Sequence, residues 1–135
     1  MASVTRTAVG AWALALFWIW MGALHFTMHD ETVRQMPSYF PWKDPIVVIT
    51  GVLELVVAVM LLPRSVRHWG AFGTMFLLVI YTPAVVHIVQ HDATPLSWPA
   101  WQRSGFRWGV VPANIGLFVW AAQYWRIGTL AAGRR

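Results

Sequence analysis

Long apolar stretches alternate with short polar ones along the whole chain, and this arrangement limits the fold more than any other feature. Only 11% of the residues are charged, whereas about 25% are charged in a typical soluble domain. A helix needs about 20 mostly apolar residues to cross the hydrocarbon core of a bilayer. We predict an all-α integral membrane four-helix bundle, a single domain over residues 1–135, with spans at residues 7–26, 45–62, 69–90 and 108–125.

Prolines and aromatic residues mark the ends and connections of these spans. Pro63 ends the second span, and Pro83 inside the third is expected to kink it, because proline cannot donate the helical hydrogen bond. The first and third connections combine prolines with aromatic residues, including Trp42 and Trp101. Tryptophan prefers the membrane–water interface. These connections are therefore expected to lie on the membrane surface, either as plain anchors or as lids over a ligand.

The basic residues predict the orientation of the spans. One set of span ends carries arginines and no acidic residue: Arg6, Arg64, Arg67, Arg126, Arg134 and Arg135. The opposite set carries Arg34, Lys43, Arg103 and Arg107, together with four acidic residues. Since basic residues concentrate on the cytoplasmic side, both termini are expected in the cytoplasm and the long connections outside. The expected location is a bacterial inner membrane.

Composition also excludes several classes of function. The net charge of +5 comes from basic residues at the span ends, not from a basic polar surface, so no nucleic-acid partner is expected. The chain contains no cysteine. It therefore performs no thiol–disulfide chemistry of its own and offers no cysteine ligand for zinc or an iron–sulfur cluster.

The pattern H-x-x-x-H-D occurs twice, at residues 25–30 and 87–92. Both copies lie at the outward end of a predicted span, and histidines four residues apart share one helix face. Neutral imidazoles ligate haem iron and first-row transition metals. This makes four residues candidate metal ligands, with simple interfacial histidines as the alternative: His25, His29, His87 and His91.

Two further polar residues fall inside the outer half of the predicted bundle. An ionised carboxylate that faces lipid is costly, so Glu54 is expected to face the interior, within reach of His25. Gly51 and Ala58 lie one turn to either side of Glu54 and would let a neighbouring helix approach. We expect His25 and Glu54 to form a catalytic pair that handles protons. The expected ligand-binding residues are His87, Asn114, Trp42 and Trp101.

Four segments together resemble the DoxX-like family of small membrane proteins. They are the G-x-x-H-F pattern at residues 22–26, the aromatic–proline loop at 37–41, the T-G-V-L-E segment at 50–54 and the L-L-P-R segment at 61–64. The resemblance implies a four-helix membrane bundle associated with quinone-linked oxidoreductases or membrane redox assemblies.

Two functions are therefore expected. The first is a membrane subunit of a redox system that binds a quinone, a haem or a first-row transition metal in the outer half of the bundle. The second is a non-catalytic module, such as an assembly factor, that binds a lipid or a partner protein. Expected partners are membrane lipid and either other membrane or periplasmic subunits or further copies of the chain. Whether the chain is itself an enzyme is left open.

Overall fold

The computed structural model describes residues 2–132, and the side chains of residues 8–127. Within this range the chain is all-helical, with no strand. The fold class predicted from the sequence is therefore confirmed at the level of an all-α protein. The helices are α1 (Ala2–Thr27), α2 (His29–Gln35), α3 (Lys43–Leu61), α4 (Arg67–Ile80), α5 (Thr82–His91) and α6 (Ala100–Ala132).

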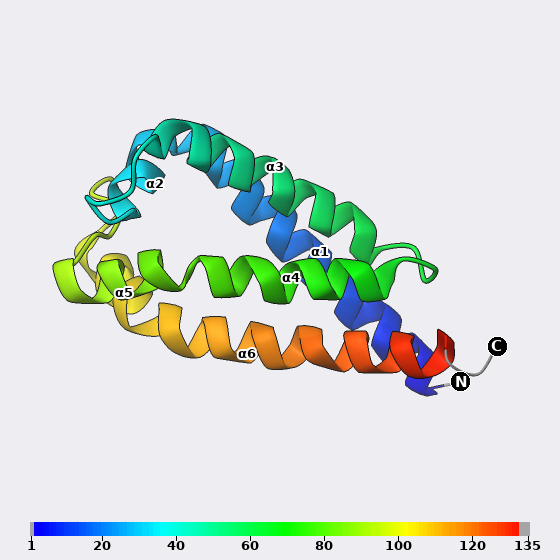
Figure 1. Cartoon of the computed structure of the whole chain (residues 1–135). Helices are drawn as coiled ribbons and strands as arrows, with labels where there is room; N and C mark the ends of the chain where they lie inside the picture. Colours follow the sequence, from blue (N-terminus) through cyan, green and yellow to red (C-terminus); the bar gives the residue numbers. More distant parts are fainter. Residues whose placement is uncertain (1, 133–135) are drawn as a thin grey trace.

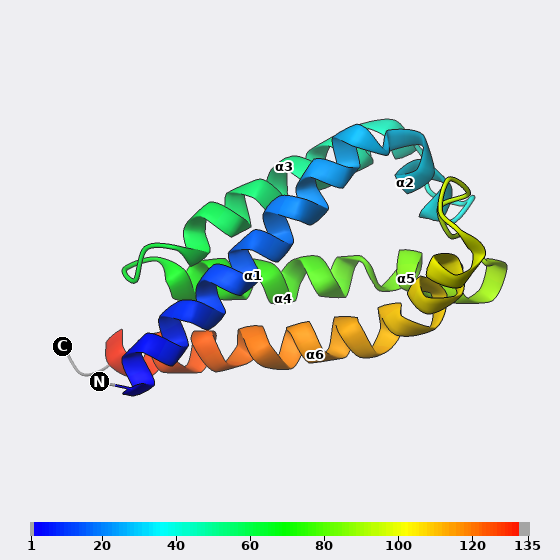
Figure 2. The same ribbon diagram turned by 180° about the vertical axis from the view of Figure 1, so that it is seen from behind.

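The long helices form two pairs that diverge toward one end of the molecule. Helix α1 packs along α3, α4 packs along α6, and a short turn brings α4 back against α3. Both chain ends lie at one end of the bundle, and α2, α5 and the segment 92–99 lie at the other (Figures 1 and 2). The pairs spread apart toward the α2–α5 end, which gives the molecule a wedge shape.

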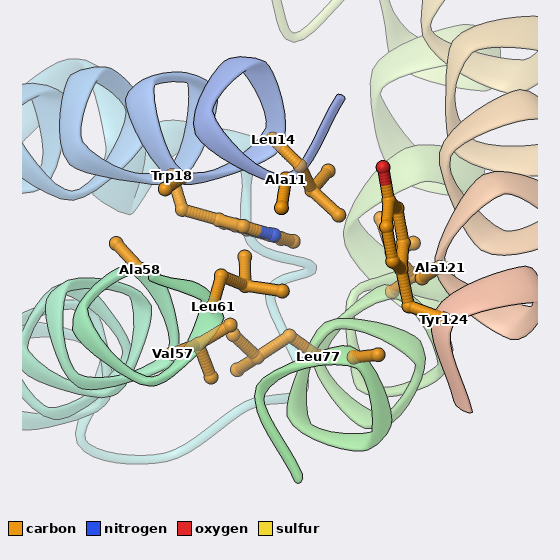
Figure 3. Packing of buried hydrophobic residues seen from close by; sticks show 12 residues of the cluster. Ala11, Leu14, Trp18, Val57, Ala58, Leu61, Leu77, Ala121 and Tyr124 are labelled. Carbon is orange, nitrogen blue, oxygen red and sulfur yellow. The ribbon is translucent and has the colours of Figure 1, made fainter. Parts of the chain in front are cut away.

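The hydrophobic core fills the narrow part of this wedge. Figure 3 shows Leu14 and Trp18 of α1 beside Leu61 of α3, with Leu77 of α4 and Tyr124 of α6 completing the cluster. The Trp18 indole nitrogen donates a hydrogen bond of 3.0 Å to the Thr74 hydroxyl, so its polar atom is satisfied inside the core. The core therefore fixes how the two helix pairs meet and leaves their other ends apart.

Two helices are long and apolar enough to cross a membrane, α3 and the part of α1 that covers Ala8–Thr27. Helices α4 and α5 count as a third if the bent pair is one span. Many large apolar side chains on these helices are exposed, among them Leu16 and Val59, which fits contact with lipid. Helix α6, which contains Pro112, does not meet the criterion among the residues described.

The third predicted span, 69–90, is two helices. The predicted kink is confirmed, since α4 and α5 meet at an angle of 41°. Pro83 lies in the first turn of α5 and has no N–H for the carbonyl of Val79, so the α-helical ladder is interrupted there. Tyr81 occupies the break between the helices, and the bend sets the position of its side chain.

The helix that contains the fourth predicted span, 108–125, begins eight residues before it. Helix α6 already starts at Ala100, so Trp101 lies in its first turn and not in a surface loop. Two arginines stabilise this polar extension. Arg103 donates to the Thr94 hydroxyl at 2.9 Å, and Arg107 donates twice to the Val89 carbonyl at 2.9 and 2.7 Å.

Candidate functional site

Two glycines let α1 and α3 approach closely at one depth. A Cβ atom added at Gly51 would lie 2.7 Å from the Cβ of His25, and one added at Gly22 would lie 3.1 Å from the Gly51 carbonyl oxygen. Only glycine fits at such a distance. The close contact brings His25 of α1 directly against the face of α3 that carries Glu54.

Three polar side chains meet there, from three different helical segments. Glu54 is fully buried and His25 is 7% exposed. The Tyr81 hydroxyl donates a hydrogen bond of 2.7 Å to Glu54 Oε1, and His25 Nδ1 lies 3.1 Å from Glu54 Oε2. The rings of His25 and Tyr81 are stacked, with centroids 6.3 Å apart. The expectation that Glu54 faces the interior within reach of His25 is confirmed.

The second carboxylate oxygen of Glu54 has an unusual environment. His25 Nδ1 also lies 3.1 Å from the Met21 carbonyl oxygen, which takes its hydrogen bond. Glu54 Oε2 is in ion-pair range of the ring but accepts no hydrogen bond from the residues described. A buried carboxylate oxygen with no donor is costly. This oxygen is thus a natural place for a proton that Glu54 and His25 share.

A cavity of about 470 Å³ lies between the diverging helix pairs, and His25 and Tyr81 form part of its wall. Most of its lining is aliphatic or aromatic, as in sites for apolar ligands. Glu54 does not line it and instead lies behind His25 and Tyr81. The opposite wall, on α6, carries Asn114. The cavity therefore combines an apolar interior with a few polar groups at one depth.

A contact between the two helix pairs lies beside the cavity at the α2–α5 end. The carboxylate of Glu31 on α2 accepts hydrogen bonds from the backbone N–H groups of Leu96 and Ser97, at 3.1 to 3.3 Å. Arg34 donates to the same carboxylate at 2.7 Å. Glu31 itself lines the cavity. This contact ties α2 to the segment 92–99 at the wide end of the wedge.

Comparison with known proteins identifies the family. A family model described as a domain of unknown function (DUF8561) matches residues 14–125. The chain belongs to the DUF8561 family. The match covers α2 to α5 in full and most of α1 and α6, so it includes the cavity and its polar wall. No curated protein matches the chain, and no solved structure does.

The ligand-binding residues predicted from the sequence separate into two groups in this DUF8561 chain. Asn114 lines the cavity, but His87, Trp42 and Trp101 do not. Trp42 and Trp101 are 80% and 73% exposed. Trp42 precedes α3 in a left-handed backbone conformation that turns the chain at that point. From the same two connections, it is Phe40 and Trp98 that reach the cavity.

The structure does not bring the four outer histidines together. His25 faces Glu54, and His29 lies 3.5 Å from Asp30 and 3.9 Å from Asp44. His87 and His91 stack on each other, with ring centroids 4.5 Å apart. Among the described residues, no group of three or more histidine, aspartate or glutamate side chains is arranged to hold a metal ion. The geometry gives the predicted metal site no support.

Two important residues escaped the sequence analysis. Tyr81 holds Glu54, but a tyrosine near the end of an apolar stretch looks like an ordinary interface residue. The nearby Pro83 was the available signal, because a helix break at that depth would place a polar side chain inside the bundle. From the sequence, Glu31 was indistinguishable from an ordinary acidic residue in a connecting loop. Its carboxylate bonds the backbone of Leu96 and Ser97, which lie 65 and 66 residues further along the chain. A local sequence pattern does not predict a contact over that distance.

Proposed function

We propose that this DUF8561 protein binds a lipophilic redox ligand of the quinone class in its cavity, as a membrane subunit of a redox system. The observation that carries the proposal is the cluster of His25, Glu54 and Tyr81 on the wall of a mostly apolar cavity. A quinone needs an apolar site for its ring and tail. It also needs polar groups that exchange protons with its oxygens when it is reduced or oxidised.

The roles of the residues follow from their positions. His25 lines the cavity and would meet the ligand, so we assign it the proton exchange with a quinone oxygen. Glu54 lies behind it and would hold the ring and share its proton. Tyr81 bonds the other carboxylate oxygen and positions Glu54. Asn114, on α6, would bind the ligand from the opposite wall.

The openings of the cavity favour entry from the bilayer. The Glu31 contact joins the two helix pairs at the α2–α5 end. Trp20 on α1 and Ile80 on α4 line the cavity and are 54% and 40% exposed. We propose that the cavity is reached between the helices at these residues. A ligand dissolved in lipid could enter there without crossing water.

The proposal includes four membrane spans, formed by α1, α3, the bent pair α4–α5, and α6. Helix α6 runs alongside α4, which supports its inclusion. The arginine distribution supports cytoplasmic termini, in a bacterial inner membrane. The α2–α5 end, the cavity and the polar cluster would then belong to the periplasmic half. This arrangement is the one that the resemblance to DoxX-like proteins implies.

Binding of decylubiquinone to the purified full chain in a non-ionic detergent tests the proposal. Wild type should bind saturably. His25→Asn is the informative variant, because its amide nitrogen takes the place of Nδ1 beside Met21 and Glu54 but nothing takes the place of Nε2. We expect its affinity to fall about tenfold, the equivalent of one lost hydrogen bond of about 1.4 kcal/mol. Phe26→Leu, an exposed neighbour on α1, is the matched control and should bind normally.

Absence of saturable binding by wild type would overturn the proposal. The second candidate, a non-catalytic module that binds lipid or a partner protein, would then take its place. One observation favours that candidate: most of the cavity lining is apolar, and Glu54 is screened from the cavity by His25 and Tyr81. Glu54→Gln removes the proton-sharing pair and distinguishes the two candidates. A lipid-binding module with this substitution would bind uncharged lipids as well as wild type does. In a redox assembly, the same substitution would stop the reduction or oxidation of the quinone.

A further inference from the structure

We infer that the cavity selects an uncharged amphiphile whose head group accepts a hydrogen bond, and that it excludes anionic lipids. This inference rests on the proposed function, since it concerns the ligand of the same cavity. It goes further because it states which ligand head groups the cavity accepts. The charges around the cavity and the hydrogen-bonding capacity of its wall support it independently.

The charges around the cavity are unfavourable for an anion. No lysine or arginine of the described part of the chain lines it. Its wall holds the carboxylate of Glu31, and the carboxyl group of Glu54 lies directly behind His25. A phosphate or carboxylate head would lose its hydration there and meet no cation in return. The negative head group would also be repelled by the carboxylate of Glu31.

The basic residues at the wide end of the wedge are already engaged elsewhere. Each makes a hydrogen bond or ion pair that holds a local backbone or loop. Arg34 bonds Glu31, Lys43 bonds the Met36 carbonyl, Arg103 bonds Thr94 and pairs with Asp92, and Arg107 bonds the Val89 carbonyl. Recruiting one of them to an anionic ligand would break a contact that shapes the cavity.

The number of protons that the His25–Glu54 pair holds favours a ligand whose head group accepts a hydrogen bond. In an apolar bilayer interior the pair is least costly in its net-neutral form, which holds two protons. Glu54 Oε2 faces Nδ1 at 3.1 Å. We take the form in which one proton lies between these two atoms, because it gives the otherwise unpartnered Oε2 a hydrogen bond. The second proton then lies on Nε2. Because Nδ1 is occupied by Met21 and Glu54, Nε2 is the ring nitrogen left for a ligand, and it acts as a donor.

Three further polar side chains around the cavity agree with this assignment. Thr50 donates its hydroxyl proton to the carbonyls of Ile46 and Val47, and Tyr81 donates its own to Glu54. Neither proton is available to a ligand. The Asn114 amide, on the opposite wall, can donate as well as accept. A carbonyl oxygen can accept a hydrogen bond from either group, whereas a carboxylate would bring a charge that neither group neutralises.

Three probes of similar chain length test the inference on the purified full chain: decylubiquinone, tridecan-2-one and dodecanoate. Binding is measured in a non-ionic detergent at pH about 8.5, where the carboxylic acid is ionised. We expect the quinone and the ketone to bind at least about tenfold more tightly than dodecanoate. Asn114→Lys should reverse the preference by adding a cation to the wall. Asn114→Gln is its uncharged control and should keep the wild-type order.

The outcomes separate the inference from the proposed function. If decylubiquinone binds but dodecanoate binds as tightly, the inference fails and the proposed function stands. If the ketone and the quinone bind and dodecanoate does not, the inference is supported whether or not the quinone is the tighter ligand. If no probe binds saturably, both fail. A folded Asn114→Lys variant, checked by its helical circular dichroism, that gains no affinity for dodecanoate would also contradict the charge argument.

Discussion

Tyr81 illustrates how a single hydroxyl can decide the state of a buried acid. Its proton is donated to Glu54 Oε1 at 2.7 Å, while Oε2 accepts no hydrogen bond from the described residues. The two oxygens of one carboxyl group therefore have different surroundings. The bonded oxygen is held toward the α4–α5 break, and the other lies 3.1 Å from His25 Nδ1. This asymmetry gives the pair a direction, from Glu54 through His25 to the cavity.

Replacing Tyr81 by phenylalanine should expose the cost of leaving Glu54 without a donor. We expect Tyr81→Phe to lower the free energy of unfolding by about 1–3 kcal/mol, because a buried acceptor loses its partner while the aromatic packing stays. Thermal unfolding in detergent, followed by circular dichroism, measures the change. Tyr39→Phe is the matched control, since Tyr39 is 72% exposed, and it should change stability very little. Equal effects of the two substitutions would contradict the assigned role of Tyr81.

The sequence predicted the central pair of the site but not its surroundings. The cost of a lipid-facing acid was enough to place Glu54 inside and near His25, because that argument needs only depth and polarity. It could not select among the histidines, since helix rotation decides which of them face inward. It also placed Trp42 and Trp101 at the ligand site, whereas Phe40 and Trp98 line the cavity. The direction of a loop side chain depends on backbone turns such as the left-handed one at Trp42.

At the level of the helices, the contact between α1 and α3 determines the geometry of the site. Gly22 and Gly51 face each other across it, and Leu55 packs over Gly22. A close helix contact of this kind holds His25 against Glu54 without any loop. The sequence pointed to it through Gly51, one turn before Glu54. The partner glycine on α1 became recognisable only once the two helices were seen together.

Gly51→Ala should disrupt this contact. The added methyl group would lie 2.7 Å from the Cβ of His25, an atom fixed to the backbone, so α1 must move away from α3. We expect a loss of about 1–3 kcal/mol in stability, with weaker ligand binding. Gly116→Ala is the control, because a Cβ there meets nothing within 4 Å. It should be neutral or stabilising by about 0.5–1 kcal/mol. Thermal unfolding measures the stability of both variants. Equal stability of Gly51→Ala and Gly116→Ala would contradict the importance of the contact between α1 and α3.

The helix boundaries show where sequence reasoning reached its limit. Apolar length predicted the first two spans well, since α1 and α3 contain residues 7–26 and nearly all of 45–62. Apolar length did not predict the start of α6 at Ala100, because its first turns are polar and depend on bonds from Arg103 and Arg107 to distant segments. Proline correctly predicted the kink before α5. The tyrosine placed in that break, and its bond to Glu54, required the tertiary structure.

For the molecule as a whole, the wedge shape separates a packed end from a hollow one. The core cluster holds the helix pairs together near the chain ends, and the Glu31 contact ties them again at the opposite end. The cavity lies between these two points of attachment. The two attachments therefore frame the apolar space in which we propose that a ligand binds.

Orientation can be tested directly because the chain contains no cysteine. Single cysteines introduced as Ser38→Cys and Ser97→Cys lie in exposed positions at the α2–α5 end. An impermeant maleimide should label both in intact cells if that end is periplasmic, as the arginine distribution predicts. Ser65→Cys, exposed in the turn between α3 and α4, should be labelled only after lysis. The reverse pattern would place the cavity in the cytoplasmic half.

Photoaffinity labelling with an azido-substituted quinone tests the central claim, that the cavity beside His25 is the ligand site. Mass spectrometry of the labelled full chain should find the label among the residues that line the cavity, including the stretches 17–28 and 109–117. Excess decylubiquinone should suppress it, and His25→Asn should weaken it. Label spread over outward-facing residues such as Val52 and Val119, insensitive to competitor and to His25→Asn, would contradict the account.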